Sequence, residues 1–283
     1  MDKARIKFGG FYFEIIYESG YVGEFFRAFF QGVTLAVAAD LHVKVSVLPA
    51  TNRPNIMPGA KYAYSVQGST FNFGPDLIKG AWDGKNNTCL LALDRSILNE
   101  NEVWLLNLLM CRIFYSLSLK KRKTMAFIVH SSAVRKDGKV YGFFGPSGSG
   151  KSTIAFYSHQ YEVLHDDMNL VYIVGGKPYV EGVPFNPKRL YFADDGGPLS
   201  MFFSLHKSDE TKVEKGTRAE FANAVLTEIV MPLPLLSNDR VAASKYLLNC
   251  VDELVGRTPY YRLYFKKDGS FWDQINELEG NCE

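Results

Sequence analysis

The sequence predicts a mixed α/β (α+β) protein, with a β-rich N-terminal part followed by a part in which strands and helices are mixed. Aromatic and β-branched segments, separated by Gly, Pro and Asn clusters, dominate residues 1–98. Helical periodicity follows at 101–119, 217–230 and 239–255, with strand-like segments between these ranges. Because strands and helices do not alternate regularly, we expect packed layers rather than repeated βα units.

Three segments of the N-terminal part have the composition of strands. They lie at residues 8–17, 41–47 and 89–93, and turn-forming residues at 49–58 and 83–87 separate them. This part is therefore expected to form a sheet.

An apolar helix is expected to close the N-terminal part. Asn and acidic residues at 99–102 favour a helix start, and the basic run 120–123 stabilises the negative dipole end of a helix over 101–119. We place the domain boundary after this helix. Residues 1–122 then form the β-rich part and residues 123–283 the second domain, the two sharing one core.

Composition favours a protein of the cytoplasm that binds neither nucleic acid nor membrane. The chain has 283 residues, 47% of them hydrophobic, and a formal net charge of only +2, so no strong field attracts polyanions. The apolar segment 103–119 is short for a bilayer and contains Asn107 and Arg112. The four cysteines lack metal-ligand spacing, and the N-terminus lacks the apolar run of a signal peptide.

A hairpin is predicted at the start of the second domain. Residues 126–130 and 133–134 are expected to pair with 140–144, because Asp137-Gly138 between apolar segments is a strong hairpin signal. The pattern further predicts a helix at 152–159, strands at 161–165, 168–174 and 179–183, helices at 217–230 and 239–255, and a strand at 260–265.

Residues 145–153, Gly-Pro-Ser-Gly-Ser-Gly-Lys-Ser-Thr, match the phosphate-binding pattern G-x-x-x-x-G-K-[ST]. The glycines allow a tight curl that points backbone N–H groups at phosphate oxygens, and the preceding strand and following helix provide the required context. Mg-ATP binding is therefore favoured over a Gly/Ser-rich turn without a ligand. The expected nucleotide-binding residues are Gly145, Pro146, Ser147, Gly148, Ser149, Gly150, Lys151, Ser152 and Thr153.

Two adjacent carboxylates, Asp166 and Asp167, follow Lys151 after one short helix and one short strand. This close spacing returns the chain to the sheet beside the loop. Adjacent side chains at a strand end point to opposite sides, so one carboxylate can hold Mg²⁺ while the other faces an acceptor. Phosphoryl transfer needs this division, which favours a catalytic pair over a solvated Asp-Asp turn.

The order His130 on a strand, phosphate loop and His165-Asp166-Asp167 resembles the catalytic domain of HPr kinase/phosphorylase. The resemblance covers about residues 125–270. It implies a phosphoenolpyruvate-carboxykinase-like P-loop core, a cytoplasmic serine kinase activity and assembly into a homo-oligomer.

The resemblance also implies a role for each matching residue. Asp166 would be the general base, Asp167 and Ser152 the magnesium partners, and Lys151 the clamp on the terminal phosphate. His130 would help to position phosphate or the aspartates; as a strand histidine it also suits a purely structural role. Arg189 is the candidate for stabilising the transferred group, and Arg218 and Arg240 compete with it.

Thr153 stands where HPr kinases carry an acidic residue, so the reverse, phosphate-removing reaction is not expected. The sequence therefore predicts an ATP-dependent kinase acting on a hydroxyl of a protein, peptide or small molecule. The alternative is a non-catalytic ATP-binding regulatory or scaffold module whose N-terminal part contacts a partner. A carboxykinase acting on an organic acid is disfavoured, since its additional metal-binding Lys and His residues are not found.

Overall fold

The computed structural model describes residues 1–29, 38–49, 64–73, 77–98, 106–107, 109–110, 112–113, 115, 125–184, 196–230 and 239–280. Contacts divide the chain into two compact units. The N-terminal unit is built mainly from Met1–Lys121, and the C-terminal unit from Arg122–Val183, Tyr191–Val230 and Tyr246–Glu283. Residues 184 and 239–245 also belong to the N-terminal unit. Each unit has a mixed sheet and its own helices, which confirms the mixed α+β class.

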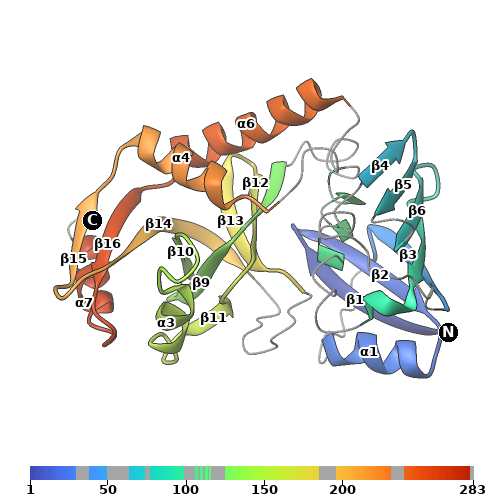
Figure 1. The fold of residues 1–283 in the computed structure, drawn as a ribbon, viewed down its shortest axis with the longest axis horizontal. Helices are drawn as coiled ribbons and strands as arrows, with labels where there is room; N and C mark the ends of the chain where they lie inside the picture. Colours follow the sequence, from blue (N-terminus) through green and yellow to red (C-terminus); the bar gives the residue numbers. More distant parts are fainter. Residues whose placement is uncertain are drawn as a thin grey trace. The chain divides into compact units, whose positions relative to one another are not determined.

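The N-terminal unit is a seven-stranded sheet in the order β1-β2-β3-β7-β6-β5-β4 (Figure 1). One face is apolar and packs against Phe26 of helix α1 (Tyr21–Phe29) and the helical residues Leu106, Leu109 and Met110. The strands are β1 (Asp2–Phe8), β2 (Phe11–Tyr17), β3 (Leu41–Leu48), β4 (Tyr64–Gln67), β5 (Thr70–Phe73), β6 (Ile78–Asp83) and β7 (Thr88–Asp94), followed by the 3-10 helix η2 (Arg95–Ile97).

The predicted strand over 8–17 is wrong in one respect: two strands meet within it. Phe8 pairs with Phe11 across a two-residue turn, and Gly9 and Gly10 have φ angles of 61° and 75°. Positive φ at both positions is the requirement of a tight hairpin turn, which two consecutive glycines meet without steric cost.

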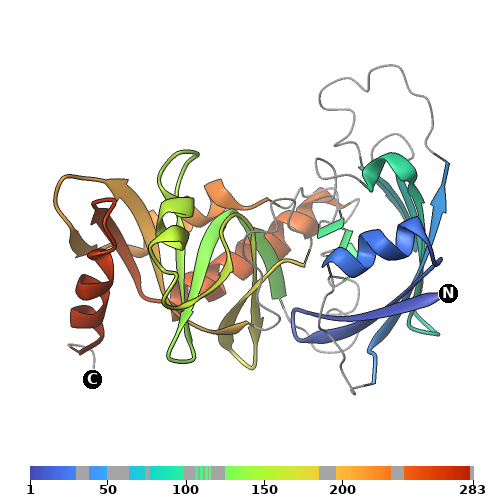
Figure 2. The same cartoon turned by 90° about the horizontal axis from the view of Figure 1, so that it is seen from below.

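The C-terminal unit is a nine-stranded sheet with helices on both faces (Figures 1 and 2). The main path runs β11-β9-β10-β14-β13-β12-β8, and β16 pairs with β14 and β15. The strands are β8 (Met125–Val129), β9 (Ser131–Lys136), β10 (Lys139–Phe144), β11 (Glu162–His165), β12 (Asn169–Val174), β13 (Lys177–Gly182), β14 (Gly197–Lys207), β15 (Lys212–Lys215) and β16 (Tyr260–Phe265).

Two helical layers bury the faces of this sheet. Helices α3 (Lys151–Phe156) and α7 (Phe271–Gly280) pack on the face that carries Tyr141, Phe143 and Phe203. On the opposite face, Phe221 of α4 (Arg218–Glu228) stacks on Phe144 and Tyr260. Helix α6 (Arg240–Arg257) joins α4 on that side (Figure 1). Its Tyr246 hydroxyl accepts a hydrogen bond from the backbone of β8 at 2.9 Å.

The predicted hairpin of β9 and β10 is confirmed, but the pairing of residues 126–130 with β10 is wrong. Strand β8 pairs with β12, because the chain turns at His130 and only β9 continues beside β10. The helix predicted at 152–159 ends at Phe156. The sequence prediction also left out β14, the strand that links the two halves of this sheet.

The carboxyl ends of four strands meet at one edge of the sheet. Strands β10, β14 and β16 are parallel, and β11 points the same way because both β10 and β11 are antiparallel to β9. Ligands of open α/β sheets bind outside the carboxyl ends of the strands. We term this edge the carboxyl edge. A ligand is therefore expected to contact the segments that follow these four strands.

Candidate functional site

The segment predicted to bind phosphate lies at the carboxyl edge, between β10 and α3. Its last glycine, Gly150, has a φ of 114° and lies against an aromatic ring: a Cβ there would stand 2.5 Å from Phe265 Cζ. Both the backbone angle and the contact require glycine. The ring of Phe265 therefore packs against the loop at Gly150. The sequence motif alone does not reveal this contact.

Lys151 folds back over this loop. Its side chain is buried, and Nζ donates hydrogen bonds to the carbonyl oxygens of Gly145 and Pro146, the latter at 3.4 Å. Ser152 is exposed, and Thr153 is partly exposed.

Asp166 and Asp167 form a bend between β11 and β12 rather than a strand end. The buried ring of His165 holds this bend, because its Nδ1 accepts the backbone N–H groups of Asp167 and Met168 at 3.0 and 3.1 Å. The two carboxylates differ in access: the side chain of Asp166 is 2% exposed and that of Asp167 is 32% exposed.

His130 connects Asp167 to Glu228. Its Nε2 lies 2.9 Å from Asp167 Oδ1, and its Nδ1 lies 3.3 Å from Glu228 Oε2. A singly protonated imidazole can donate to only one of these carboxylates, whereas a doubly protonated ring donates to both. Glu228, at the last residue of α4, is thus a site residue that the sequence prediction missed.

Backbone hydrogen bonds fix this chain of three side chains. The N–H of His130 donates to the carbonyl of Glu228 at 2.8 Å, and the N–H of Ser131 donates to the carbonyl of Asp167 at 3.0 Å. Asn169 donates to the carbonyl oxygen of Ser131 at 2.7 Å. The end of α4 and the aspartate bend are therefore both anchored to the start of β9.

Strand β9 lies between the aspartate bend and the phosphate loop. Ser131, which binds the backbone of Asp167, pairs with Phe144, the residue before Gly145. Two strand spacings separate the backbones of Asp167 and Phe144, a distance of roughly 10 Å. The loop, His130 and the aspartate bend thus lie along one edge.

Of the three arginine candidates, the structure describes Arg218 and Arg240. Arg189 lies outside the described residues. Arg218 opens α4 and pairs with Asp252 of α6 at 3.6 Å. Because Glu228 is at the other end of that helix, Arg218 is about 15 Å from it along the axis. Arg240 is exposed at the start of α6.

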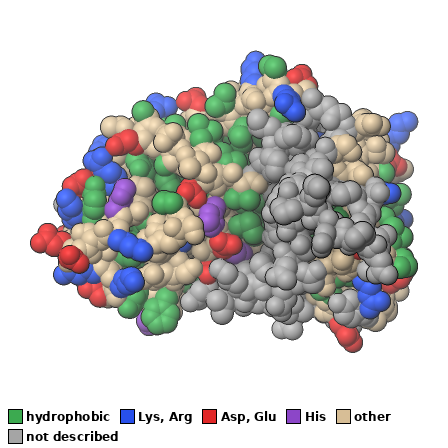
Figure 3. Space-filling model, viewed as in Figure 1, with side chains coloured by type: hydrophobic (Ala, Val, Ile, Leu, Met, Phe, Trp, Pro, Cys, Tyr) green, Lys and Arg blue, Asp and Glu red, His purple; other side chains and the backbone are tan. Residues whose placement is uncertain are grey.

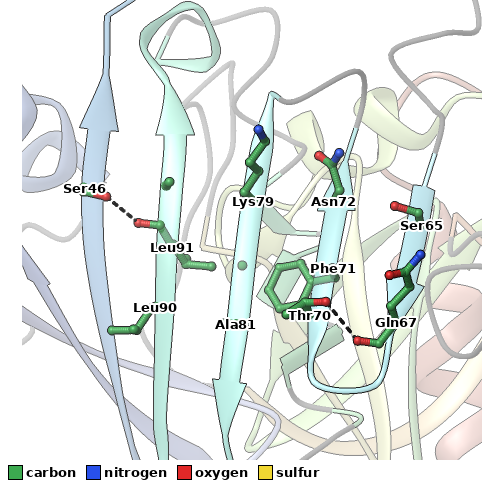
Figure 4. Close-up of a pocket in the computed structure, with 12 residues that line it drawn as sticks. Ser46, Ser65, Gln67, Thr70, Phe71, Asn72, Lys79, Ala81, Leu90 and Leu91 are labelled. Atoms are coloured by element: carbon green, nitrogen blue, oxygen red, sulfur yellow. Dashed lines mark hydrogen bonds between the residues drawn. The ribbon is translucent and has the colours of Figure 1, made fainter.

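Among the described residues, each unit has an open cavity large enough for a small molecule. One, of about 490 Å³, lies on the exposed face of the N-terminal sheet, where Ser46 donates to the carbonyl of Leu91 and Thr70 to that of Gln67 (Figure 4). The other, of about 430 Å³, lies at the carboxyl edge of the C-terminal unit and is lined by Lys207, Ser208, Asp209, Phe265, Lys266 and Lys267.

Within the described ranges, no three His, Cys, Asp or Glu side chains are arranged to hold a metal ion. Magnesium bound with a nucleotide takes most of its ligands from phosphates and water, so one hydroxyl and one carboxylate are a sufficient protein contribution. Ser152 and the aspartate bend can supply these two groups. In the same part of the chain, no helix is long and apolar enough to cross a bilayer.

The chain matches no family model, and no curated protein is similar to it. The case for a function therefore comes from the residues and geometry of the carboxyl edge.

Proposed function

We propose that this protein is an ATP-dependent kinase that transfers a phosphoryl group to a hydroxyl of a protein, peptide or small molecule, as the resemblance to HPr kinase implies. The observation that carries the proposal is the shared carboxyl edge of the phosphate loop, the aspartate bend and the pair His130–Glu228. Such an edge supplies the two requirements of phosphoryl transfer, a cradle for phosphate charge and a group that accepts the proton of the acceptor hydroxyl.

The exposure of the two aspartates leads us to exchange the roles that the resemblance implies. Asp167 is one-third exposed and is held by His130, so it is our candidate for the general base. Asp166, which is 2% exposed, joins Ser152 as a candidate partner of magnesium.

The proposed mechanism uses few groups of the chain. ATP, when bound, supplies the phosphoryl group. Lys151 and the loop N–H groups hold phosphate oxygens. Asp167 takes the proton of the acceptor hydroxyl while the hydroxyl oxygen bonds to the terminal phosphorus of ATP and the bond from that phosphorus to the leaving ADP breaks. His130 orients the Asp167 carboxylate, and Glu228 orients His130.

Transfer of labelled phosphate from Mg-ATP to free serine or to serine-containing peptides and proteins tests this proposal. Asp167→Asn is expected to lower the transfer rate by about 10²–10⁴-fold while the Kd for Mg-ATP changes less than about threefold. Asp166→Asn should raise the magnesium concentration needed for half-maximal rate. Full activity of Asp167→Asn would remove this residue from the mechanism and return the base role to Asp166.

The alternative, an ATP-binding module without transferase activity, is favoured by one observation. The exposed sheet face of the N-terminal unit carries a cavity, lined by both polar and apolar side chains, that the proposed phosphoryl transfer does not use (Figure 4). This alternative predicts tight Mg-ATP binding with no consumption of ATP in the presence of every acceptor.

A further inference from the structure

The cavity at the carboxyl edge lies next to the phosphate loop. It is formed by two segments, Lys207–Asp209 after β14 and Phe265–Lys267 after β16. Phe265 is the residue whose ring lies against Gly150. A Cβ on Gly145, at the other end of the loop, would lie 3.6 Å from the carbonyl oxygen of Leu205, two residues before the first segment. Both cavity segments are therefore continuous with residues that touch the loop.

The sheet order places this cavity and the aspartate bend on opposite sides of the loop. The loop follows β10. On one side of β10 come β9 and β11, which carry His130 and the aspartates; on the other come β14 and β16, which carry the cavity. A nucleoside triphosphate also has two different ends, the reacting phosphate at one and the base at the other. If the reacting end faces the carboxylates, as the proposed function requires, the nucleoside end faces β14 and β16.

The chemistry of the lining suits a nucleoside joined to phosphates. Three lysines and one aspartate give the cavity a net positive charge, and Figure 3 shows basic and acidic side chains intermixed over this end of the unit. The backbone N–H of Ser208 donates to the carbonyl of Phe265 at 3.2 Å, which joins the two segments. In the part of the chain that the structure describes, no ion pair involves the side chains of Lys207, Asp209 or Lys267.

We propose that this cavity binds the base and ribose of the nucleotide whose phosphates occupy the loop. This inference rests on the proposed function for the direction of the nucleotide. Asp209 accepts hydrogen bonds from the ribose hydroxyls, and the alkyl chain of Lys207 lies on a face of the base with its ammonium toward the phosphates. A volume of about 430 Å³ is within the range of small-molecule sites.

Titration calorimetry with Mg-ATP, Mg-2′,3′-dideoxy-ATP and magnesium tripolyphosphate tests the inference, because only the first has the ribose hydroxyls and only the last lacks a nucleoside. The intact protein should bind Mg-ATP at least about tenfold more tightly than either of the others. Asp209→Asn should weaken Mg-ATP by about tenfold, leave tripolyphosphate within twofold and abolish the preference over dideoxy-ATP. Lys207→Ala should weaken both nucleotides more than tripolyphosphate. Lys215→Ala, an exposed lysine of β15, is the matched control and should change none of them.

Three outcomes would overturn the inference. Equal binding of Mg-ATP and tripolyphosphate, unaffected by the cavity variants, would mean that the nucleoside lies elsewhere while the loop still binds phosphate. Equal weakening of all three ligands by the cavity variants would identify a general anion patch. Binding of none of the three ligands by the intact protein would contradict the loop as a phosphate site, and with it both this inference and the proposed kinase.

Discussion

Gly150 combines two constraints that are separable by substitution. It has a left-handed backbone angle, and it leaves room for the ring of Phe265. Gly148 in the same loop has a φ of 78° but a Cβ there would meet nothing within 4 Å. Both glycines therefore need a positive φ angle, but only Gly150 also lies against a side chain of the sheet.

Gly150→Ala is expected to destabilise the protein more than Gly148→Ala, and to weaken Mg-ATP binding more strongly. The backbone strain of either alanine costs about 1–3 kcal/mol, and only at Gly150 must Phe265 also move. Urea unfolding and calorimetric titration of both variants measure the difference. Equal losses would mean that the contact with Phe265 is unimportant for the loop.

His130 lies between Glu228 and Asp167, so under the proposed mechanism the removal of Glu228 should affect the rate and not the binding of nucleotide. Glu228→Gln is expected to lower phosphoryl transfer by about tenfold and to leave the Kd for Mg-ATP unchanged, because the amide holds the His130 ring less firmly than the carboxylate does. Glu253→Gln, which removes a surface pair with Arg257, is the control. An unchanged transfer rate would assign Glu228 to fold stability alone.

At the scale of elements, one carboxylate of α7 contacts three side chains of the β9–β10 hairpin. Glu279 accepts a hydrogen bond from the Tyr141 hydroxyl and pairs with Lys136 at 2.9 Å and with Lys139 at 3.3 Å. Burial alone would raise the pKa of Glu279, but the hydrogen bonds from Tyr141 and Lys136 and the Lys136 charge outweigh it and hold the pKa below 4.5. Burial and the same carboxylate raise the pKa of Tyr141.

This carboxylate makes the stability of α7 docking dependent on pH. Because the pKa of Glu279 is lower in the folded than in the unfolded chain, its contribution is present above about pH 4.5 and is lost as the pH falls through the folded pKa. Glu279→Gln should lower the free energy of unfolding by about 1–2 kcal/mol at pH 7 and by less at pH 3. Glu214→Gln at the exposed pair with Lys212 is the control and should lower the free energy of unfolding less than Glu279→Gln does at pH 7. A loss at Glu279 that does not depend on pH would contradict this account.

Elements with strong local signals could be predicted from the sequence. The β9–β10 turn has positive φ at Asp137 and Gly138, as the Asp-Gly pair requires, and the strand, loop and helix around Gly145–Lys151 follow from the motif. Pairing between distant strands could not be predicted. Nothing local to His130 indicates that β8 pairs with β12 rather than with β10, because the two paired segments are far apart in the sequence.

Some residues of the candidate site could likewise be predicted from local motifs, and others could not. The phosphate loop and the aspartate pair are local motifs, and the chain carries them in one short stretch. Glu228 ends α4, and the segment Lys207–Asp209 follows β14. A backbone hydrogen bond from His130 brings Glu228 to the carboxyl edge, and the pairing of β14 with β10 brings Lys207–Asp209 there. The different exposure of Asp166 and Asp167 depends on the bend that His165 holds, which alternation along a strand does not predict.

At the scale of the whole molecule, the chain passes between the two units repeatedly, after Lys121, Val183, Leu190, Val230 and Lys245. Each unit also contains a buried thiol: burial raises the pKa of Cys89 in the N-terminal unit and of Cys250 in the C-terminal unit to about 12. Such thiols react with alkylating agents only after the surrounding structure opens.

The repeated crossings predict that the two units unfold together. In a Cys111→Ser, Cys282→Ser background, Cys89 and Cys250 should become reactive over the same range of urea concentration. Pulse alkylation followed by peptide mass analysis measures both thiols in one sample. Labelling of Cys89 at a clearly lower urea concentration than Cys250 would show that the N-terminal unit unfolds independently.

Trp272 of α7 gives the molecule a built-in optical reporter. Its indole nitrogen donates to Ser158, just beyond α3, at 2.9 Å, and its ring packs against Tyr141, Phe143 and Tyr161 in the cluster that also contains Phe265. Any ligand that shifts α3 or the ring beneath Gly150 therefore changes the surroundings of this indole. The emission of Trp272, isolated by replacing the other two tryptophans, can follow occupancy of the loop without a label or an assay of turnover.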